Sequence, residues 1–138
     1  MTLQNIPVSV ESVEEYSIGN LRALLAEIAT LLEEFTRDGT CGNIDLNSLP
    51  FAPGEYEQLR QLLGQGEVSV HIEAVGPSEI IETRYPGVWW ATHYNVEGDI
   101  VADTLEITDI PEIIKSQSAD IATGLELLRA QLNDEVKQ

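Results

Sequence analysis

The middle of the chain changes from helical to strand periodicity, and the connections between its strand-like runs are very short. Four runs show this pattern: 67–74, 78–85, 88–95 and 99–107. The first, "EVSVHIEA", alternates apolar and polar side chains, as a strand with one buried face does. The separators are Gly76-Pro77, Pro86-Gly87 and Glu97-Gly98. Because connections this short join antiparallel neighbours, the sequence predicts a four-stranded antiparallel β-meander over about residues 67–107.

Helical periodicity lies on both sides of this segment. Apolar residues recur at three- and four-residue spacing from Asn20, a plausible N-cap, to Phe35, and Gly39 follows the end. A shorter helical pattern starts at Pro53 and stops before Gly64. A third stripe consists of Ile121, Leu125, Leu128 and Leu132. We therefore expect a two-layer α+β domain in which the N-terminal and C-terminal helices cover one face of the sheet.

The length of 138 residues fits one domain, which we expect to span residues 17–138. Residues 1–16 are acidic and weakly patterned, so we expect a flexible arm or an edge strand there. No apolar run approaches the roughly 18 residues of a membrane span. The first residues lack a basic start followed by an apolar block, so cytoplasm is the expected location.

The chain is strongly acidic, with 24 Asp and Glu residues against 7 Lys and Arg residues. Between Gln61 and Ile114 the only strongly basic residue is Arg84. This composition argues against binding to nucleic acid or to an anionic membrane surface, because neither phosphate backbone nor lipid would meet a basic patch. The charge fits either a solvated surface that keeps the protein soluble or steering toward a basic partner.

Counting through two-residue turns predicts which strand positions face each other. Ile72 then opposes Ile81, and Trp90 opposes Thr83 on one side and Leu105 on the other. Directly opposed residues share a face of the sheet. The apolar face predicted in this way includes Val68, Val70, Ile72, Ile81, Val88, Trp90, Leu105 and Ile107. Thr92 and Asp103 fall on the same face, which predicts either a hydrogen-bonded pair or a local bulge.

The opposite face is predicted to be polar and to carry Trp89. The same count places Arg84 opposite Trp89 and His71 opposite Glu82, with His93 on this face as well. Trp89 is then either covered by another element or an exposed anchor for a partner, since an aromatic beside an arginine is typical of binding hot spots. The predicted partner-binding residues are Glu82, Arg84, Trp89, His93 and His71.

Other readings of these residues stay open. His71, Glu82 and His93 could form a weak divalent-metal site of a small carrier or enzyme, although nothing in the sequence places a nucleophile beside a histidine. No resident metal or cofactor is expected. A homodimer could bury the same sheet face, or an edge strand, against its symmetry mate.

Two segments resemble a known family. "LLGQGEVSVHIE" and "GPSEIIETRYPGVWWATHYNVEGDIVADTLEITDIPEII" are similar to the C-terminal conserved domain of the HupH/HyaF hydrogenase expression and formation proteins. The shared elements are the entry to the first strand, the hairpin around "PGVWW" and the "ADTLE" exit, and the likeness covers about residues 42–115.

The resemblance implies an accessory protein needed to make active NiFe hydrogenase. Such a protein would be a cytoplasmic assembly factor or chaperone that binds a hydrogenase subunit precursor or another maturation factor, or that acts on iron–sulfur maturation. Family members are usually longer and can carry a second related region. The matched positions Glu82, Arg84, Trp89, Trp90, His93 and Asn95 belong to the family motif, which assigns none of them a catalytic role.

Overall fold

The structure is a computed structural model that describes the backbone of residues 5–137 and the side chains of residues 19–135. Its elements in chain order are α1 (Asn5–Asp38), β1 (Gly42–Asp45), the 3-10 helix η2 (Leu46–Ser48), α2 (Glu55–Leu63), β2 (Ser69–Ile72), β3 (Ser78–Glu82), β4 (Val88–Tyr94), β5 (Ile100–Ile107), the 3-10 helix η3 (Glu112–Ile114) and α3 (Ser118–Lys137).

The strands form one antiparallel sheet in the order β1-β5-β4-β3-β2, which confirms the α+β class and the predicted meander of four strands. A fifth strand, β1, pairs with β5 and brings Ile44 opposite Leu105. The sequence prediction missed this strand because it is only four residues long and buries a single side chain, Ile44. A run this short shows no alternation that could be recognised.

The strand register differs from the predicted one in two of three hairpins. Trp90 faces Leu105 as predicted, but its partner on β3 is Ile81 rather than Thr83, a shift of two residues that leaves each face unchanged. On β2, Ile72 faces Ser78 rather than Ile81. This shift of three residues inverts the strand, because successive side chains point to opposite faces. The loops cause both shifts, since residues 73–77 and 83–87 form longer connections than two-residue turns.

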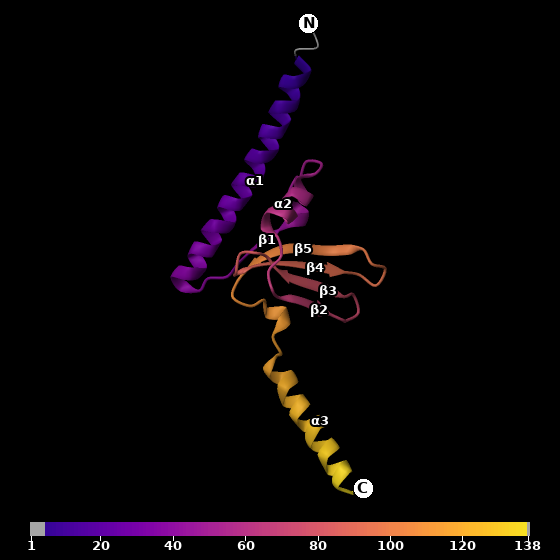
Figure 1. The fold of residues 1–138 in the computed structure, drawn as a ribbon. Coiled ribbons are helices and arrows are strands. Elements are labelled where there is room, and N and C mark those ends of the chain that lie inside the picture. Colours follow the sequence, from indigo (N-terminus) through magenta and orange to yellow (C-terminus); the bar gives the residue numbers. More distant parts are fainter. Residues whose placement is uncertain (1–4, 138) are drawn as a thin grey trace.

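Helices α1 and α2 pack on the face of the sheet that carries Trp90, here called the helix face (Figure 1). From α1 this core takes Leu21, Leu24 and Ile28, and from α2 it takes Leu59 and Leu63. The sheet contributes Ile44, Val88, Trp90, Leu105 and Ile107. Val70 and Ile72, which were expected in this core, lie on the opposite face because β2 is inverted.

The C-terminal helix does not cover the sheet, so this part of the predicted layering is wrong. Figure 1 shows α3 pointing away from the sheet and from α1 and α2. Its apolar stripe is open to solvent: Ile121 is 61% exposed and Leu128 is 56% exposed. The stripe was recognised correctly, but periodicity shows only that one side of a helix is apolar, not what the side packs against.

The N-terminal segment also differs from expectation. Residues 5–16, expected as part of an arm or edge strand, form the first turns of α1, and residues 1–4 lie outside the described part of the chain. Asn20 is therefore inside the helix rather than at its N-cap. Among the described residues, no helix combines the length and apolar character needed to cross a bilayer.

Candidate functional site

Trp89 is buried on the face of the sheet opposite to the helices. Only 5% of its surface is exposed, and it forms a small cluster with Ile80 and Ala91. Ile114 of η3 packs against this cluster. Its indole Nε1 donates a 3.1 Å hydrogen bond to the carbonyl oxygen of Thr108. The structure thus supports the covered alternative for Trp89, and the surroundings of this side chain are apolar rather than polar as predicted.

Arg84 is not opposite Trp89, whose partner on β3 is Glu82. Arg84 instead follows β3 and lies over the C-terminal end of α2. Its backbone N–H donates to the carbonyl of Leu63 at 2.8 Å, and Nη2 donates to the carbonyl of Gln61 at 3.4 Å. A cation at this end of a helix is stabilised by the unpaired carbonyls. Glycine suits position 64, because its φ is +63° and because a Cβ there would lie 2.5 Å from Arg84 Nε, so the guanidinium would have to move.

The two histidines lie on opposite faces of the sheet. His71 pairs with Glu79 on the helix face, where its Nε2 is 3.7 Å from Glu73 Oε1, so the expected pairing of His71 with Glu82 is wrong. His93 pairs with Ser78 on the Trp89 face. His71, Glu82 and His93 therefore do not converge. Among the described residues, no group of three or more His, Cys, Asp or Glu side chains is placed to hold a metal ion.

The sequence analysis did not predict that a hydroxyl group lies beside His93. Ser78 Oγ lies 2.6 Å from His93 Nδ1, across directly paired positions of β3 and β4. Ser78 is buried and His93 half-buried, and in the described part of the chain no carboxylate forms a hydrogen bond or ion pair with His93. A nucleophilic serine needs access to substrate and an oriented base, so this arrangement fits a structural pair.

A buried carboxylate joins α2 to the sheet. Asp103, which is 2% exposed, accepts hydrogen bonds from Trp90 Nε1 at 2.7 Å, Thr92 Oγ1 at 3.0 Å and the Tyr56 hydroxyl at 2.5 Å. The predicted hydrogen-bonded pair of Thr92 and Asp103 is thereby confirmed. Burial and the bond to Asp103 raise the pKa of Tyr56 well above its ordinary value. Arg60 of α2 stacks on Trp90, with its guanidinium carbon 4.6 Å from the ring centroid.

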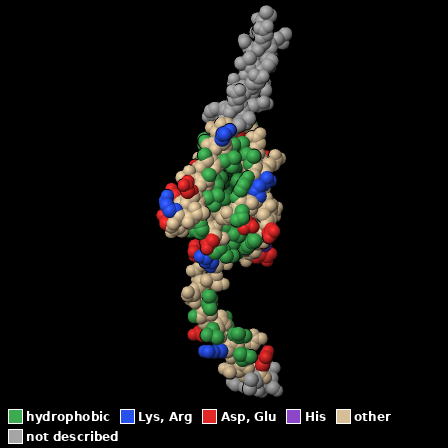
Figure 2. Space-filling model, turned by 60° about the vertical axis from the view of Figure 1, so that its left-hand side comes forward, with side chains coloured by type: hydrophobic (Ala, Val, Ile, Leu, Met, Phe, Trp, Pro, Cys, Tyr) green, Lys and Arg blue, Asp and Glu red, His purple; other side chains and the backbone are tan. Residues whose placement is uncertain are grey.

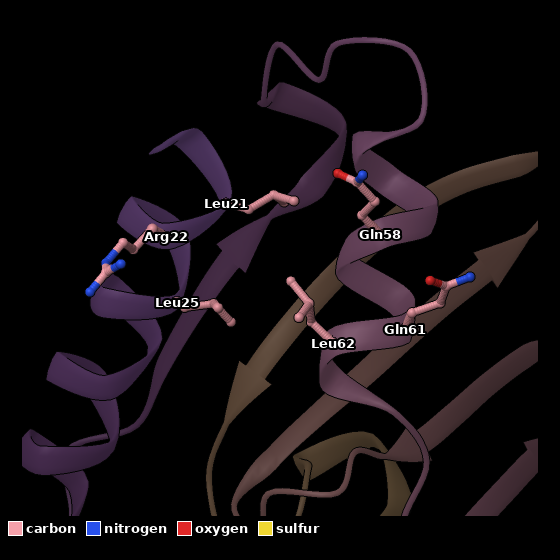
Figure 3. Close-up of a pocket in the computed structure, with 6 residues that line it drawn as sticks. All are labelled: Leu21, Arg22, Leu25, Gln58, Gln61 and Leu62. Atoms are coloured by element: carbon pink, nitrogen blue, oxygen red, sulfur yellow. The ribbon is translucent and has the colours of Figure 1, made fainter. Parts of the chain in front are cut away.

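An open apolar groove of about 640 Å³ runs between α1 and α2 (Figure 3). Leu21, Arg22 and Leu25 line it from α1, and Gln58, Gln61 and Leu62 line it from α2. Leu25 and Leu62 point toward each other across the opening, and Leu62 is 42% exposed. None of these six residues is acidic, although the chain carries a net charge of -17.

The groove is part of a wider pattern of exposed apolar surface. Figure 2 shows hydrophobic side chains gathered on one face of the body and again along α3. Patches of this kind on a small protein mark contact sites for other proteins more often than chance. In the sequence, Leu25 and Leu62 belong to the apolar stripes of their helices, and only the spacing of the two helices reveals that they border an opening.

Comparison with known proteins identifies the family. Residues 18–134 match the family model described as "HupH hydrogenase expression protein, C-terminal conserved region". The hydrogenase expression/formation protein HoxQ of Azotobacter vinelandii is 34% identical over 86 residues, which is 62% of this chain and 30% of that protein. HupH of Rhodobacter capsulatus is 28% identical over 113 residues, 82% of this chain and 41% of that protein. The chain thus spans less than half the length of these relatives.

A solved structure gives the same result. The hydrogenase expression protein HupH from Thiobacillus denitrificans superposes with a TM-score of 0.81 at 41% sequence identity, covering 84% of this chain and 97% of that one. Most of this chain therefore shares the fold of that solved structure. The chain belongs to the family of the HupH hydrogenase expression protein, C-terminal conserved region.

Proposed function

We propose that this chain is a non-enzymatic accessory protein in the expression and maturation of NiFe hydrogenase. It acts in the cytoplasm as an assembly chaperone by binding a hydrogenase subunit precursor or another maturation factor. The support is the family membership together with relatives that are named hydrogenase expression/formation proteins. An accessory protein of this kind needs a surface that recognises its client, and the described residues offer one.

The observation that carries the proposal is the groove between α1 and α2. It is apolar, open and held between two helices, as in proteins that bind an amphipathic helix of a partner. Polar side chains at its margin, Gln58 and Gln61, supply hydrogen-bonding groups around an apolar floor, which is the usual composition of an interface. We therefore assign the principal client contact to this groove.

The five residues first proposed for partner binding have a changed role in this proposal. Arg84 and His71 are exposed and Glu82 and His93 are half-buried, so each of these four can still reach a client at the rim of the sheet. Trp89 is buried and supports the sheet from within. These residues lie on both faces of the sheet and do not form one surface, so client contacts at any of the four are secondary to binding in the groove.

The test is recovery of hydrogenase subunit precursors with the tagged protein from cells that make hydrogenase. We expect Leu25→Glu and Leu62→Glu to reduce recovery at least several-fold, because each places a charge on the floor or wall of the groove. Val75→Glu is the matched control, since Val75 is 94% exposed in the β2–β3 loop. Unfolding curves verify that each variant is folded. Undiminished recovery with both folded groove variants would refute the assignment of the groove.

A further inference from the structure

A second, smaller opening lies on another side of α1 and contains a carboxylate with an unsatisfied oxygen. Its volume is about 250 Å³, and its walls include Leu21, Leu24, Leu49 and Phe51. Glu55 and Glu27 also line it. Leu21 borders both this opening and the groove between α1 and α2, so the two sites are neighbours on α1.

Glu55 is the unusual residue of this pocket. It is the first residue of α2 and is 2% exposed. Its Oε1 accepts the backbone N–H of Ala52, which ties the carboxylate to the turn before the helix. Its Oε2 is buried and has no hydrogen-bond partner among the described residues. A buried carboxylate oxygen without a donor is costly, so it calls for a partner that none of the described residues supplies.

The shape and chemistry of the pocket specify that partner. The volume is below that of pockets for drug-sized ligands and suits a single long side chain. The walls are mainly apolar, whereas Glu55 lies buried and Glu27 is exposed. A lysine or arginine side chain has the matching construction, an apolar stem that ends in a cationic hydrogen-bond donor.

We propose that this pocket binds a lysine or arginine side chain of a protein partner, with the cationic head donating to Oε2 of Glu55. None of the described residues that line the pocket is basic, and the net charge of -17 attracts basic segments over a longer range. The identity of the protein that presents the side chain rests on the proposed accessory function, but the preference of the pocket for a cationic side chain does not.

The proposal is tested by NMR titration of the full chain with N-acetyl-lysine methylamide and N-acetyl-arginine methylamide. We expect saturable shifts of the Ala52 and Glu55 amide signals, and the probe with the higher affinity identifies the preferred head group. N-acetyl-norleucine methylamide has a similar stem without the charge and should bind on the order of tenfold more weakly, since one charge-assisted hydrogen bond is lost.

Two variants distinguish binding in the pocket from general attraction to the acidic surface. Glu55→Gln keeps an oxygen that can accept from Ala52 but removes the charge, and we expect it to lower the affinity for the cationic probes by about tenfold. Glu97→Gln, in the exposed β4–β5 turn, removes an equal charge and should change nothing. Three outcomes would each overturn the proposal. The norleucine probe could bind as tightly as the cationic probes, Glu55→Gln could bind the cationic probes as tightly as the native chain does, or saturable shifts could be lacking. Because no hydrogenase component is present, such a result would leave the accessory function standing.

Discussion

Trp90 and Asp103 are linked by a 2.7 Å hydrogen bond from the indole Nε1 to the carboxylate Oδ1, inside the layer between α2 and the sheet. Thr92 and Tyr56 donate to the same carboxylate, so strands β4 and β5 and helix α2 meet at one buried group. The carboxylate accepts from two buried donors, on Trp90 and Thr92, and from the half-buried hydroxyl of Tyr56.

Replacing Asp103 tests how much this junction stabilises the fold. Asp103→Ala leaves three donors without their acceptor, and we expect it to lower the free energy of unfolding by roughly 3 kcal/mol. Asp103→Asn retains one oxygen acceptor, and its amide can donate to the Tyr56 hydroxyl, so we expect a smaller loss. Urea unfolding measures both. Asp99→Ala in the exposed β4–β5 turn is the control, and a loss for Asp103→Ala no larger than for Asp99→Ala would contradict the role of the junction.

The raised pKa of Tyr56 predicts a specific dependence of stability on alkaline pH. The ordinary tyrosine value is 10.0, and in the folded protein burial and Asp103 hold Tyr56 protonated well above it. Above pH 10 the unfolded chain therefore releases a proton that the folded chain keeps, so stability contributed by Tyr56 is complete below that pH and falls as the pH rises beyond it.

Tyr56→Phe has no titratable hydroxyl at this position, so the pH dependence of its stability can be compared with that of the native chain. We expect the variant to be less stable than the native chain at pH 8, because its ring offers Asp103 no hydroxyl, and the difference should shrink between pH 10 and pH 11. Urea unfolding at several pH values gives the two curves. Parallel curves across this range would show that Tyr56 does not titrate differently in the folded and unfolded states.

Burial of both tryptophans predicts weak fluorescence quenching. Trp89 is 5% exposed and Trp90 is 4% exposed, so acrylamide should quench the folded protein far less than the urea-unfolded chain. Trp89→Ala should lower the free energy of unfolding by about 3–5 kcal/mol, as large-to-small changes in cores do. Strong quenching of the native protein, or a Trp89→Ala variant as stable as the native chain, would instead indicate an exposed Trp89.

The exposed stripe of α3 predicts a contrast between two leucines. Leu128 is 56% exposed and Leu105 is fully buried, so Leu105→Ala should cost about 2–5 kcal/mol and Leu128→Ala less than about 0.5 kcal/mol of unfolding free energy. In addition, light scattering gives the molecular mass of the native protein and of Leu128→Glu. A large cost at Leu128, with a change of mass in the glutamate variant, would reveal that a second copy covers the stripe, as in the homodimer considered from the sequence.

Local patterns in the sequence predict much of the fold. The spacing of Leu21, Leu24 and Ile28 identifies the buried side of α1, and Trp90 is placed correctly in the core because its partner Leu105 lies across a hairpin that counting describes well. The Thr92–Asp103 pair is one of the two alternatives that the same count allows, since buried polar groups need hydrogen-bond partners.

The remaining differences arise where loop length and long-range packing decide the outcome. The loop between Ile72 and Ser78 inverts β2, which brings Val70 and Ile72 to the Trp89 face and separates His71 from His93. The groove could not be predicted, because the distance between α1 and α2 is a property of the assembled layers. Glu55 gave no signal either, since a glutamate in the first turn of a helix is ordinarily an exposed residue that favours the helix end.

The junction at Asp103 has a consequence for the affinity of the groove. Apolar contacts alone allow a helix to slide or roll on a sheet. The hydrogen bond from Tyr56 of α2 to Asp103 restricts this movement, because bonds from Trp90 and Thr92 hold the carboxylate in position within the sheet. One wall of the groove is thereby held in place before any client arrives. A client that enters a preorganised groove loses little of its binding free energy to ordering the receptor, so even a short helix can be held by a modest apolar contact.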